Sequence, residues 1–519
     1  MLKGEGVLSI RRARAHSSLL RASVALAALS CSALFVSIVV PGVLPGIAPK
    51  AAAGELSGAN RLEVWVDDSL RAAAYLSKFD VQYQSDNWLV GARFEYDEES
   101  IWDPDRGAEI TRRYAEYGDE TFTLRGGNYY ATFGRGLLLR AMEEDEVRLD
   151  RDMDGLHGMV SYRGLEGQGF VGRPRNDITY ERDDMLSGLD AAYQLAGPLR
   201  IGGGYVRLDA GDPPGEPGSD SDDYRRPIEE LAGGRIQFTH GIFDVYFEGA
   251  QRIRRGERNP RGGWTGLTGS KPKEGEAYYG AVTVGIPGYV LLLEGKNYER
   301  FDFDYSTPPP ANKDGAPLNN ADDEQGFGAV LTASPTTDIT LDGNASYAES
   351  GDDHDGAERT AAGLTIRKDW WGKGSIQIGG EYVKEDSLAV TTGYWLREYA
   401  GPSLEVSYYL TDMMSIAFKG HLYDRTDDDV EYTEVTSDIT LSHASGKSIT
   451  FSIISASEEL PHYEMGDTWY LVQLAWSLGY SHELTVKIGE ERGGITCSGG
   501  VCRYEEPFEG VRIELMSRL

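Results

Sequence analysis

The sequence predicts an all-β fold, a transmembrane antiparallel up-and-down β-barrel of about 24 strands, within a range of about 22–26. Three observations support this prediction. Apolar and polar residues alternate along many segments, short turns alternate with longer charged loops, and the last residues form one more alternating segment. Alternation with a period of two gives a strand one apolar and one polar face. An even number of strands leaves both ends of the barrel on one side of the membrane.

The segment 469–519 shows the alternation most clearly. Its three runs place every second side chain on an apolar face, opposite charged and hydroxyl side chains. The apolar positions are Tyr470, Val472, Leu474 and Trp476 in the first run, Leu484, Val486 and Ile488 in the second, and Val511, Ile513 and Leu515 in the third. We expect residues 511–519 to form the closing strand of a barrel in an outer membrane.

The polar faces of other strands carry acids and amides as well as hydroxyl groups. Asp342 and Asn344 alternate with apolar neighbours in one predicted strand, and Lys419 and His421 do so in another. Placing these groups in a dry core would be costly. We therefore expect the polar faces to line a hydrated lumen, which in a barrel of this size has room for an aqueous channel or a plug.

Turns and loops differ in length in a regular way. Short segments rich in Gly, Pro, Asn, Asp and Ser, such as 196–198, 240–241 and 445–446, suit hairpin turns. The connections between these hairpins, such as 209–226 and 304–324, are long and rich in charge and proline. Short periplasmic turns and long extracellular loops are typical of outer-membrane barrels. A soluble or anchored β protein, the less favoured alternative, has no reason to separate loop lengths in this way.

Composition and charge limit the kind of partner. The chain has 519 residues, of which 64 are Gly and 30 are Tyr, and its formal net charge is −32. Such acidity disfavours contact with polyanions, so we expect no nucleic-acid partner. Acidic groups gather in predicted loops, for example at 352–358 and 427–429. They either keep those loops soluble or bind divalent cations at the cell surface.

The first 53 residues have the pattern of an export signal. Lys and Arg side chains precede an apolar run at 22–40, and the alanines at 51–53 offer a small-residue cleavage site. We expect residues 1–53 to be a signal peptide and residues 54–519 to form a barrel in the cell outer membrane. Because the apolar run is long, an uncleaved anchor is the alternative.

The region 126–158 interrupts the regular pattern of strands and turns. It contains glycine-rich and acidic runs, and arginines lie before and within it. We expect it either to fold inward and constrict the lumen, or to form one irregular strand followed by an extracellular loop. In the first case Arg112, Arg125, Arg135 and Arg140 line the pore and place positive charge beside acidic walls, a field that would set selectivity.

The run 128–137, with the sequence NYYATFGRGL, is followed by an Asp-rich stretch and a new predicted strand. This pattern resembles a family of uncharacterised porin-like outer-membrane β-barrel proteins of diderm bacteria. The resemblance implies a signal peptide and a single barrel that fills the mature chain. It supplies no substrate and no catalytic residue. Barrels of this type often end in an aromatic residue, whereas this chain ends in Leu519.

Asp150, Asp152 and Asp154, followed by Gly155, match the start of a calcium-binding loop. Alternate carboxylates and a turn-forming glycine allow several oxygens to converge on one cation. Ser161 stands at the twelfth position, where an EF-hand loop has Glu, and the following residues have the pattern of a strand. Calcium is one alternative, an acidic loop without a metal is the other, and no further cofactor is expected.

Cys497 and Cys502 enclose a short turn in the last predicted outward loop. In an exported protein this spacing predicts a disulfide that stiffens the hairpin. The third cysteine, Cys31, lies in the predicted signal peptide, so no cysteine would be left over.

No motif in the sequence predicts an enzyme. The eight His are scattered without zinc spacing, and neither a Gly-x-Ser-x-Gly motif nor a phosphate-binding glycine loop is present. The polar lumen face favours an outer-membrane channel for passive or selective transport of small polar solutes. A plugged structural or surface-binding barrel acting through acidic loops is the first alternative, and an outer-membrane enzyme is the least favoured one. The expected partners are outer-membrane lipid, the barrel-assembly machinery and an unidentified small polar solute.

Overall fold

The computed structural model describes residues 54–67, 73–98, 107–175, 182–209, 228–255, 273–311, 323–351, 357–370, 372–389, 393–427, 430–458, 467–498, 501–505 and 507–518. The predicted signal peptide, parts of several long loops and Leu519 lie outside the described residues. The cleaved export signal therefore stays a prediction.

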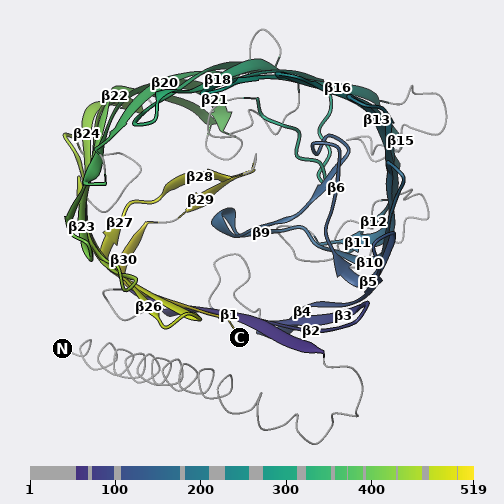
Figure 1. Cartoon of the computed structure of the whole chain (residues 1–519), viewed down its shortest axis with the longest axis horizontal. Coiled ribbons are helices and arrows are strands. Elements are labelled where there is room, and N and C mark those ends of the chain that lie inside the picture. Colours follow the sequence, from purple (N-terminus) through teal and green to yellow (C-terminus); the bar gives the residue numbers. More distant parts are fainter. Residues whose placement is uncertain are drawn as a thin grey trace, which may run out of the picture.

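The described chain forms one closed β-barrel of 24 antiparallel strands, seen as a ring in Figure 1. The wall strands are β1 (Glu55–Asp67), β2 (Ala73–Ser85), β3 (Trp88–Glu98), β4 (Ala108–Gly118), β5 (Phe122–Tyr129), β10 (Met153–Tyr162), β11 (Leu165–Pro174), β12 (Met185–Ala196), β13 (Leu199–Asp209), β14 (Ile228–His240), β15 (Phe243–Arg255), β16 (Lys273–Ile286), β17 (Tyr289–Glu299), β18 (Glu324–Thr336), β19 (Ile339–Ser350), β20 (Ala357–Asp369), β21 (Gly374–Ala389), β22 (Gly393–Thr411), β23 (Met414–Asp427), β24 (Val430–His443), β25 (Lys447–Ala456), β26 (Thr468–Leu478), β27 (His482–Glu491) and β30 (Phe508–Arg518). The predicted up-and-down barrel of about 24 strands is confirmed.

The last strand closes the ring. Leu515 of β30 lies opposite Leu62 of β1 on one side and opposite Leu484 of β27 on the other. The backbone groups of β30 are therefore paired along both edges, and neither β1 nor β27 is left with a free edge. The prediction that the final alternating segment closes the barrel is confirmed for the residues of β30.

Connections of two to four residues join the strands at the end of the barrel where β1 begins and β30 ends. Asp86 and Gly241, in two of these turns, have φ values of 49° and 60°. Positive φ is the backbone region that the tightest hairpin turns require. The longest connections, 130–152 and 300–323, lie at the opposite end, although 428–429 at that end is short. The predicted asymmetry of turns and loops is present.

Outward side chains of the wall are apolar, as the alternation predicts. In β15, Phe243 and Phe247 are each 47 % exposed, whereas Tyr246 and Glu248 of the other face are buried. A closed ring of paired strands satisfies its own backbone groups, so lipid can surround an apolar outer face of this kind. No helix within the described residues is long and apolar enough to cross a membrane.

Charged side chains of the inner face pair across neighbouring strands. Lys296 and Glu324, both fully buried, form an ion pair between β17 and β18. Arg425 Nη1 lies 2.8 Å from Glu434 Oε1, which joins β23 to β24. Pairing offsets part of the large cost of taking each charge out of water. The inner face therefore carries charge where the sequence predicts a polar lumen face.

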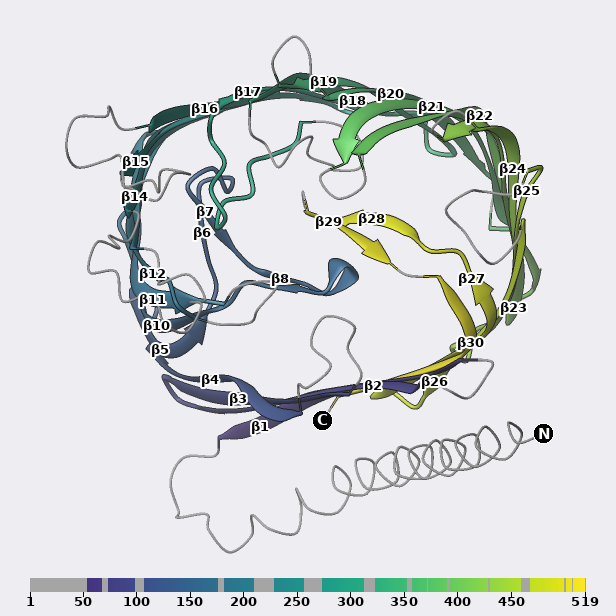
Figure 2. The same ribbon diagram turned by 180° about the vertical axis from the view of Figure 1, so that it is seen from behind.

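Three connections fold into the ring (Figures 1 and 2). One is the stretch 300–311 between β17 and β18, and the other two contain short elements of their own. The first, between β5 and β10, contains β6 (Ala131–Phe133), β7 (Leu139–Ala141), β8 (Glu143–Glu144), the short 3₁₀-helix η2 (Asp145–Val147) and β9 (Leu149–Asp150). The second, between β27 and β30, contains the hairpin of β28 (Gly494–Ser498) and β29 (Val501–Glu505), which contacts η2.

The first of these connections corrects the predicted bounds of the irregular region, and the second shows where the cysteine hairpin lies. The irregular region is narrower than 126–158, because β5 continues to Tyr129 and β10 begins at Met153. The loop that carries Cys497 and Cys502 leaves the wall at the end of the long connections, which is the predicted extracellular end, and its hairpin leans over the lumen to reach η2.

Candidate functional site

The inward segment, defined as residues 130–152, packs against one side of the barrel through apolar side chains. Phe133, Leu137, Leu138 and Leu139 are at most 1 % exposed. Full burial of such a side chain is worth about 1.5–3 kcal/mol, so these contacts fix the segment to the wall between β11 and β14. The wall side chains of the same buried cluster include Phe170, Leu186, Val206 and Leu231.

The Gly-Arg-Gly run at 134–136 turns the inward segment at its contact with β15. Gly134 and Gly136 have φ values of 58° and 96°, a region that other residues rarely adopt. A Cβ atom at Gly134 would collide with the Glu248 carboxylate, and one at Gly136 would lie 2.8 Å from the Thr307 carbonyl oxygen. Because this space is free, the backbone N–H of Arg135 donates a hydrogen bond of 2.9 Å to Glu248 Oε2.

A second stretch, residues 301–311 of the connection between β17 and β18, braces the inward segment. The Arg140 N–H donates to the Tyr305 carbonyl at 2.9 Å, and the Thr307 N–H donates to the Gly136 carbonyl at 3.1 Å. The Tyr305 hydroxyl donates to Asp184 Oδ2 at 2.6 Å. These bonds join two connections that are far apart in the sequence into one body inside the ring.

The later part of the inward segment, beyond the apolar contacts, presents Glu143 to basic side chains of β3 and β4. Glu143 accepts hydrogen bonds from Arg93 of β3 and, at 2.8 Å, from Arg112 of β4. Burial alone would raise the pKa of Glu143, but the hydrogen bonds and charges of Arg93 and Arg112 outweigh burial and lower the pKa to about 2. Glu143 is therefore a carboxylate at neutral pH and holds the segment to β3 and β4.

The tip of the inward segment reaches β1 and β2. Asp145 Oδ1 lies 3.7 Å from Arg61 Nη1 and 3.5 Å from Lys78 Nζ. Arg148 lies 3.7 Å from Glu63 Oε1, and its guanidinium carbon is 4.6 Å from the centre of the Trp65 ring. The segment is thus held at both ends, by an apolar cluster on one wall and by ion pairs on another.

The three aspartates of the predicted calcium loop do not converge on one point. Among the residues that the structure describes, no group of three or more His, Cys, Asp or Glu side chains is arranged to hold a metal ion. Each aspartate instead faces an arginine: Asp150 lies 3.1 Å from Arg175, Asp152 lies 2.5 Å from Arg182, and Asp154 lies 3.5 Å from Arg113. These contacts use the carboxylate oxygens that a calcium ion would need, and we do not carry the calcium hypothesis further.

Burial, and next the charge of Asp150, raise the pKa of Asp152 above its ordinary value, although Arg182 and Asn128 act in the opposite direction. Asp152 is 1 % exposed. This aspartate lies where the inward segment rejoins the wall, so its hydrogen bonds to Asn128 and Arg182 anchor the return of the chain into β10.

The four predicted pore-lining arginines lie in different surroundings. Arg112 contacts the inward segment through Glu143, but Arg125 of β5 pairs with Glu116 of β4 at 2.6 Å. Arg140 is half-buried, its backbone N–H bonds to the Tyr305 carbonyl, and burial lowers the pKa of its side chain. Arg135 is exposed to a cavity. At β1–β4 the charges mostly have the opposite sense to the predicted basic segment beside acidic walls: Glu143 and Asp145 of the segment meet arginines and a lysine of the wall, whereas Arg148 meets Glu63 of β1.

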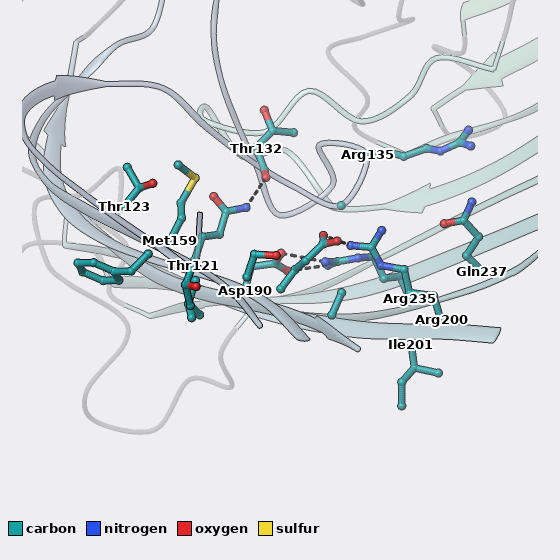
Figure 3. A pocket seen from close by; sticks show the side chains of 18 of the residues that line it. Thr121, Thr123, Thr132, Arg135, Met159, Asp190, Arg200, Ile201, Arg235 and Gln237 are labelled. Atoms are coloured by element: carbon teal, nitrogen blue, oxygen red, sulfur yellow. Dashed lines mark hydrogen bonds and ion pairs between the residues drawn. The ribbon is translucent and has the colours of Figure 1, made fainter. Parts of the chain in front are cut away.

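This cavity, which we call the vestibule, has a volume of about 540 Å³ and lies between the inward segment and the wall. Asp119 of the turn between β4 and β5 lines it, so it lies toward the short-turn end of the barrel. Figure 3 shows Arg135 extending from the inward segment on one side, and Asp190 and Arg235 of the wall strands on the other. Of the four predicted pore-lining arginines, Arg135 is the one whose side chain is exposed and lines the vestibule.

The backbone of the β28–β29 hairpin places Cys497 and Cys502 directly opposite each other. Opposite residues of an antiparallel pair have Cα atoms about 4.5–5.5 Å apart, which falls within the range that a disulfide spans. The disulfide itself stays a prediction.

Sequence reasoning did not identify several partners of the inward segment, namely Arg93, Arg175, Tyr246, Glu248 and Tyr279. All but Arg175, which directly follows β11, lie on alternating strands, where the pattern shows only that they face inward. The glycines around Arg135 were the one local signal of a close backbone contact.

A family model described as "Family of unknown function (DUF6029)" matches residues 60–320 and 404–519, which is more than half of the chain. The chain belongs to this family. No protein among those with curated functions matches it. The resemblance to uncharacterised porin-like barrels is confirmed at the level of an uncharacterised family with a barrel fold.

Among solved structures, the P pilus usher (PapC) translocation pore is similar, with 10% identity and a TM-score of 0.49, over 90% of this chain and 99% of that chain. The copper transporter OprC has 10% identity and a TM-score of 0.43, over 91% and 81% of the two chains. The outer membrane protein opdK from Pseudomonas aeruginosa has 10% identity and a TM-score of 0.41, over 69% and 98%. Because the identities are 10% and the TM-scores are below 0.5, we infer nothing about the function of this chain from these three structures.

Proposed function

We propose that this chain is an outer-membrane channel for small polar solutes, with a lumen narrowed by the inward segment. One observation carries the proposal: residues 130–152 cross a charge-lined lumen from β15 to β1–β4 and are fixed at both ends. An apolar outer face suits lipid, which with the barrel-assembly machinery is the expected partner. The proposal assigns no chemical step to the chain.

The charges around the inward segment would govern which solutes pass. On one side of it, Arg93 and Arg112 face Glu143, and on the other side Arg135 faces the vestibule. Rings and pairs of opposite charge at a constriction favour polar solutes that can exchange water for these groups. Selectivity would therefore depend on the side chains of the segment and on those of the wall that face it.

A second function is favoured by the same contacts. The buried leucines and the ion pairs at the tip hold the segment firmly enough that it could act as a permanent plug. The barrel would then be a structural or surface-binding protein that acts through its acidic loops. Conductance separates the two functions.

The experiment excises the inward segment and leaves the wall intact. Tyr129 and Met153 are register partners of β5 and β10, so residues 130–152 can be replaced by an Asn-Gly turn, which suits a two-residue hairpin. We expect both forms to conduct in planar bilayers and the excised form to have a severalfold larger single-channel conductance. Heat-modifiable migration in gels would establish that each form has folded.

A matched control shortens the connection between β15 and β16, residues 256–272, in the same way. This variant should keep the native conductance. A correctly folded native barrel that never conducts, together with an excised form that does, would instead support the plugged structural function. Silence of both folded forms would rule out the channel.

A further inference from the structure

Arg135 presents its guanidinium to the vestibule from the inward segment. Its guanidinium donates a hydrogen bond of 2.9 Å to the Tyr279 hydroxyl, and its carbon lies 4.4 Å from the centre of the Tyr246 ring. Within the described part of the chain, no carboxylate forms an ion pair with this guanidinium. One hydrogen bond leaves four of its five N–H groups for a ligand.

The other two arginines of the vestibule are already neutralised. Arg235 Nη1 and Nη2 bond to the two oxygens of Asp190 at 2.5 and 2.8 Å. Arg200 forms an ion pair with Glu166. The bidentate pair of Arg235 and Asp190 is strong, whereas the exposed pair of Arg200 and Glu166 is weaker. Each of these arginines still has a carboxylate beside it, and among the described residues that line the vestibule Arg135 is the arginine that has none in ion-pair contact.

Four described acids line the vestibule: Asp190 and Glu166 are held by Arg235 and Arg200, and the other two lie near its rim. Asp119 Oδ1 accepts backbone hydrogen bonds from Thr121 and Phe122 at 2.8 and 2.9 Å, and these bonds lower the pKa of Asp119. Glu120 lies beside it in the same turn and also lines the vestibule. A ligand therefore meets negative charge at the short-turn rim and positive charge at the inward segment.

We propose that the vestibule binds a small organic monocarboxylate, with Arg135 as the group that binds its carboxylate. The volume of about 540 Å³ lies within the range of small-molecule sites. The planar guanidinium matches a carboxylate, and stacking on Tyr246 fixes its orientation. The acids of the rim repel ligands that carry several negative charges, so one carboxylate is favoured over a polyphosphate.

This inference rests on the proposed function, because the bound carboxylate would be a solute that the channel admits. The binding site itself requires no conduction. Calorimetric titration of the detergent-solubilised full chain therefore tests the site separately, with benzoate as the probe and its uncharged amide, benzamide, as the matched control ligand.

Native protein should bind benzoate about tenfold or more tightly than benzamide, because charge-assisted hydrogen bonds are lost with the charge. Arg135→Gln should weaken benzoate binding about tenfold or more, and Arg135→Lys should restore part of it, because the charge returns without the planar fork. Arg367→Gln is the control variant: this arginine of β20 pairs with Asp369, away from the vestibule, and should bind benzoate like the native chain.

Two results would overturn the proposal. The first is that native protein does not bind benzoate, and the second is that folded Arg135→Gln protein binds benzoate as tightly as the native chain. Heat-modifiable migration of each variant distinguishes a lost site from a lost fold. Tight benzoate binding by a barrel that does not conduct would support the binding site and contradict the channel. Conduction without benzoate binding would support the channel and contradict the binding site.

Discussion

At the scale of single residues, Glu143 shows how the barrel holds its inward segment. Its carboxylate lies between Arg93 and Arg112, and its side chain is 19 % exposed. A partly buried acid of this kind stabilises docking only while it is charged and paired. Removing the charge leaves Arg93 with Asp80 at 2.8 Å, and leaves Arg112 with Asp150 at 3.7 Å as its remaining acid. The contact of the segment with β3 and β4 is then weaker, so the protonation state of one side chain affects the position of the segment.

The low pKa of Glu143 predicts that the inward segment loosens in acid. The pKa is lowered from 4.5 to about 2 in the docked segment. A lowered pKa means that the contribution of Glu143 to docking is complete above about pH 4.5 and is lost as the pH falls toward about 2. We expect single-channel conductance to rise across this range, and Glu143→Gln to raise conductance at neutral pH and to remove most of the acid response.

A matched control is Asp338→Asn. Hydrogen bonds from Lys368 and Thr336 lower the pKa of Asp338 as well, but Asp338 lies in the turn between β18 and β19, away from the inward segment. This variant should keep the native response to acid. If Glu143→Gln keeps that response too, a different group controls the segment.

At the scale of elements, the sequence predicted what short-range patterns determine and missed what distant contacts determine. The run from Tyr470 to Trp476 was predicted as a strand because alternation is local and reports which face meets lipid. The partners of the inward segment are distant: Arg93 lies 50 residues before Glu143, and Glu248 lies 113 residues after Arg135. A pattern of charge does not reveal which strands a barrel brings opposite each other.

The β28–β29 hairpin is the element with the most direct chemical test. Because Cys497 and Cys502 are register partners in a predicted extracellular environment, we expect a disulfide in the mature protein. Intact mass measured without reductant should be 2 Da lower than after reduction, the mass of the two hydrogens that a disulfide lacks. Thiol labelling without reductant should be absent in the native chain and appear once in Cys497→Ser. Double labelling of the unreduced native chain would contradict the disulfide.

At the scale of the whole molecule, the barrel depends on its closing strand. The register of β1 with β30 runs from Ala59 opposite Arg518 to Asp67 opposite Gly510. Lipid offers no hydrogen bonds to strand edges, and each unpaired backbone group in hydrocarbon costs several kcal/mol. An open barrel of this size therefore cannot persist in a membrane, whereas long connections can vary because they do not complete the ring.

Deleting residues 511–519 should abolish membrane assembly. The deletion removes every register pair between β1 and β30 except the one at Gly510, and it also exposes most of the edge of β27. We expect the truncated chain to lose heat-modifiable migration and to be extracted from membranes by urea. The variant shortened at 256–272 keeps every wall strand and should assemble normally, which separates loss of closure from loss of length. Normal assembly of the truncated chain would mean that β1 and β27 can pair directly, and that a ring with one strand fewer is stable in lipid.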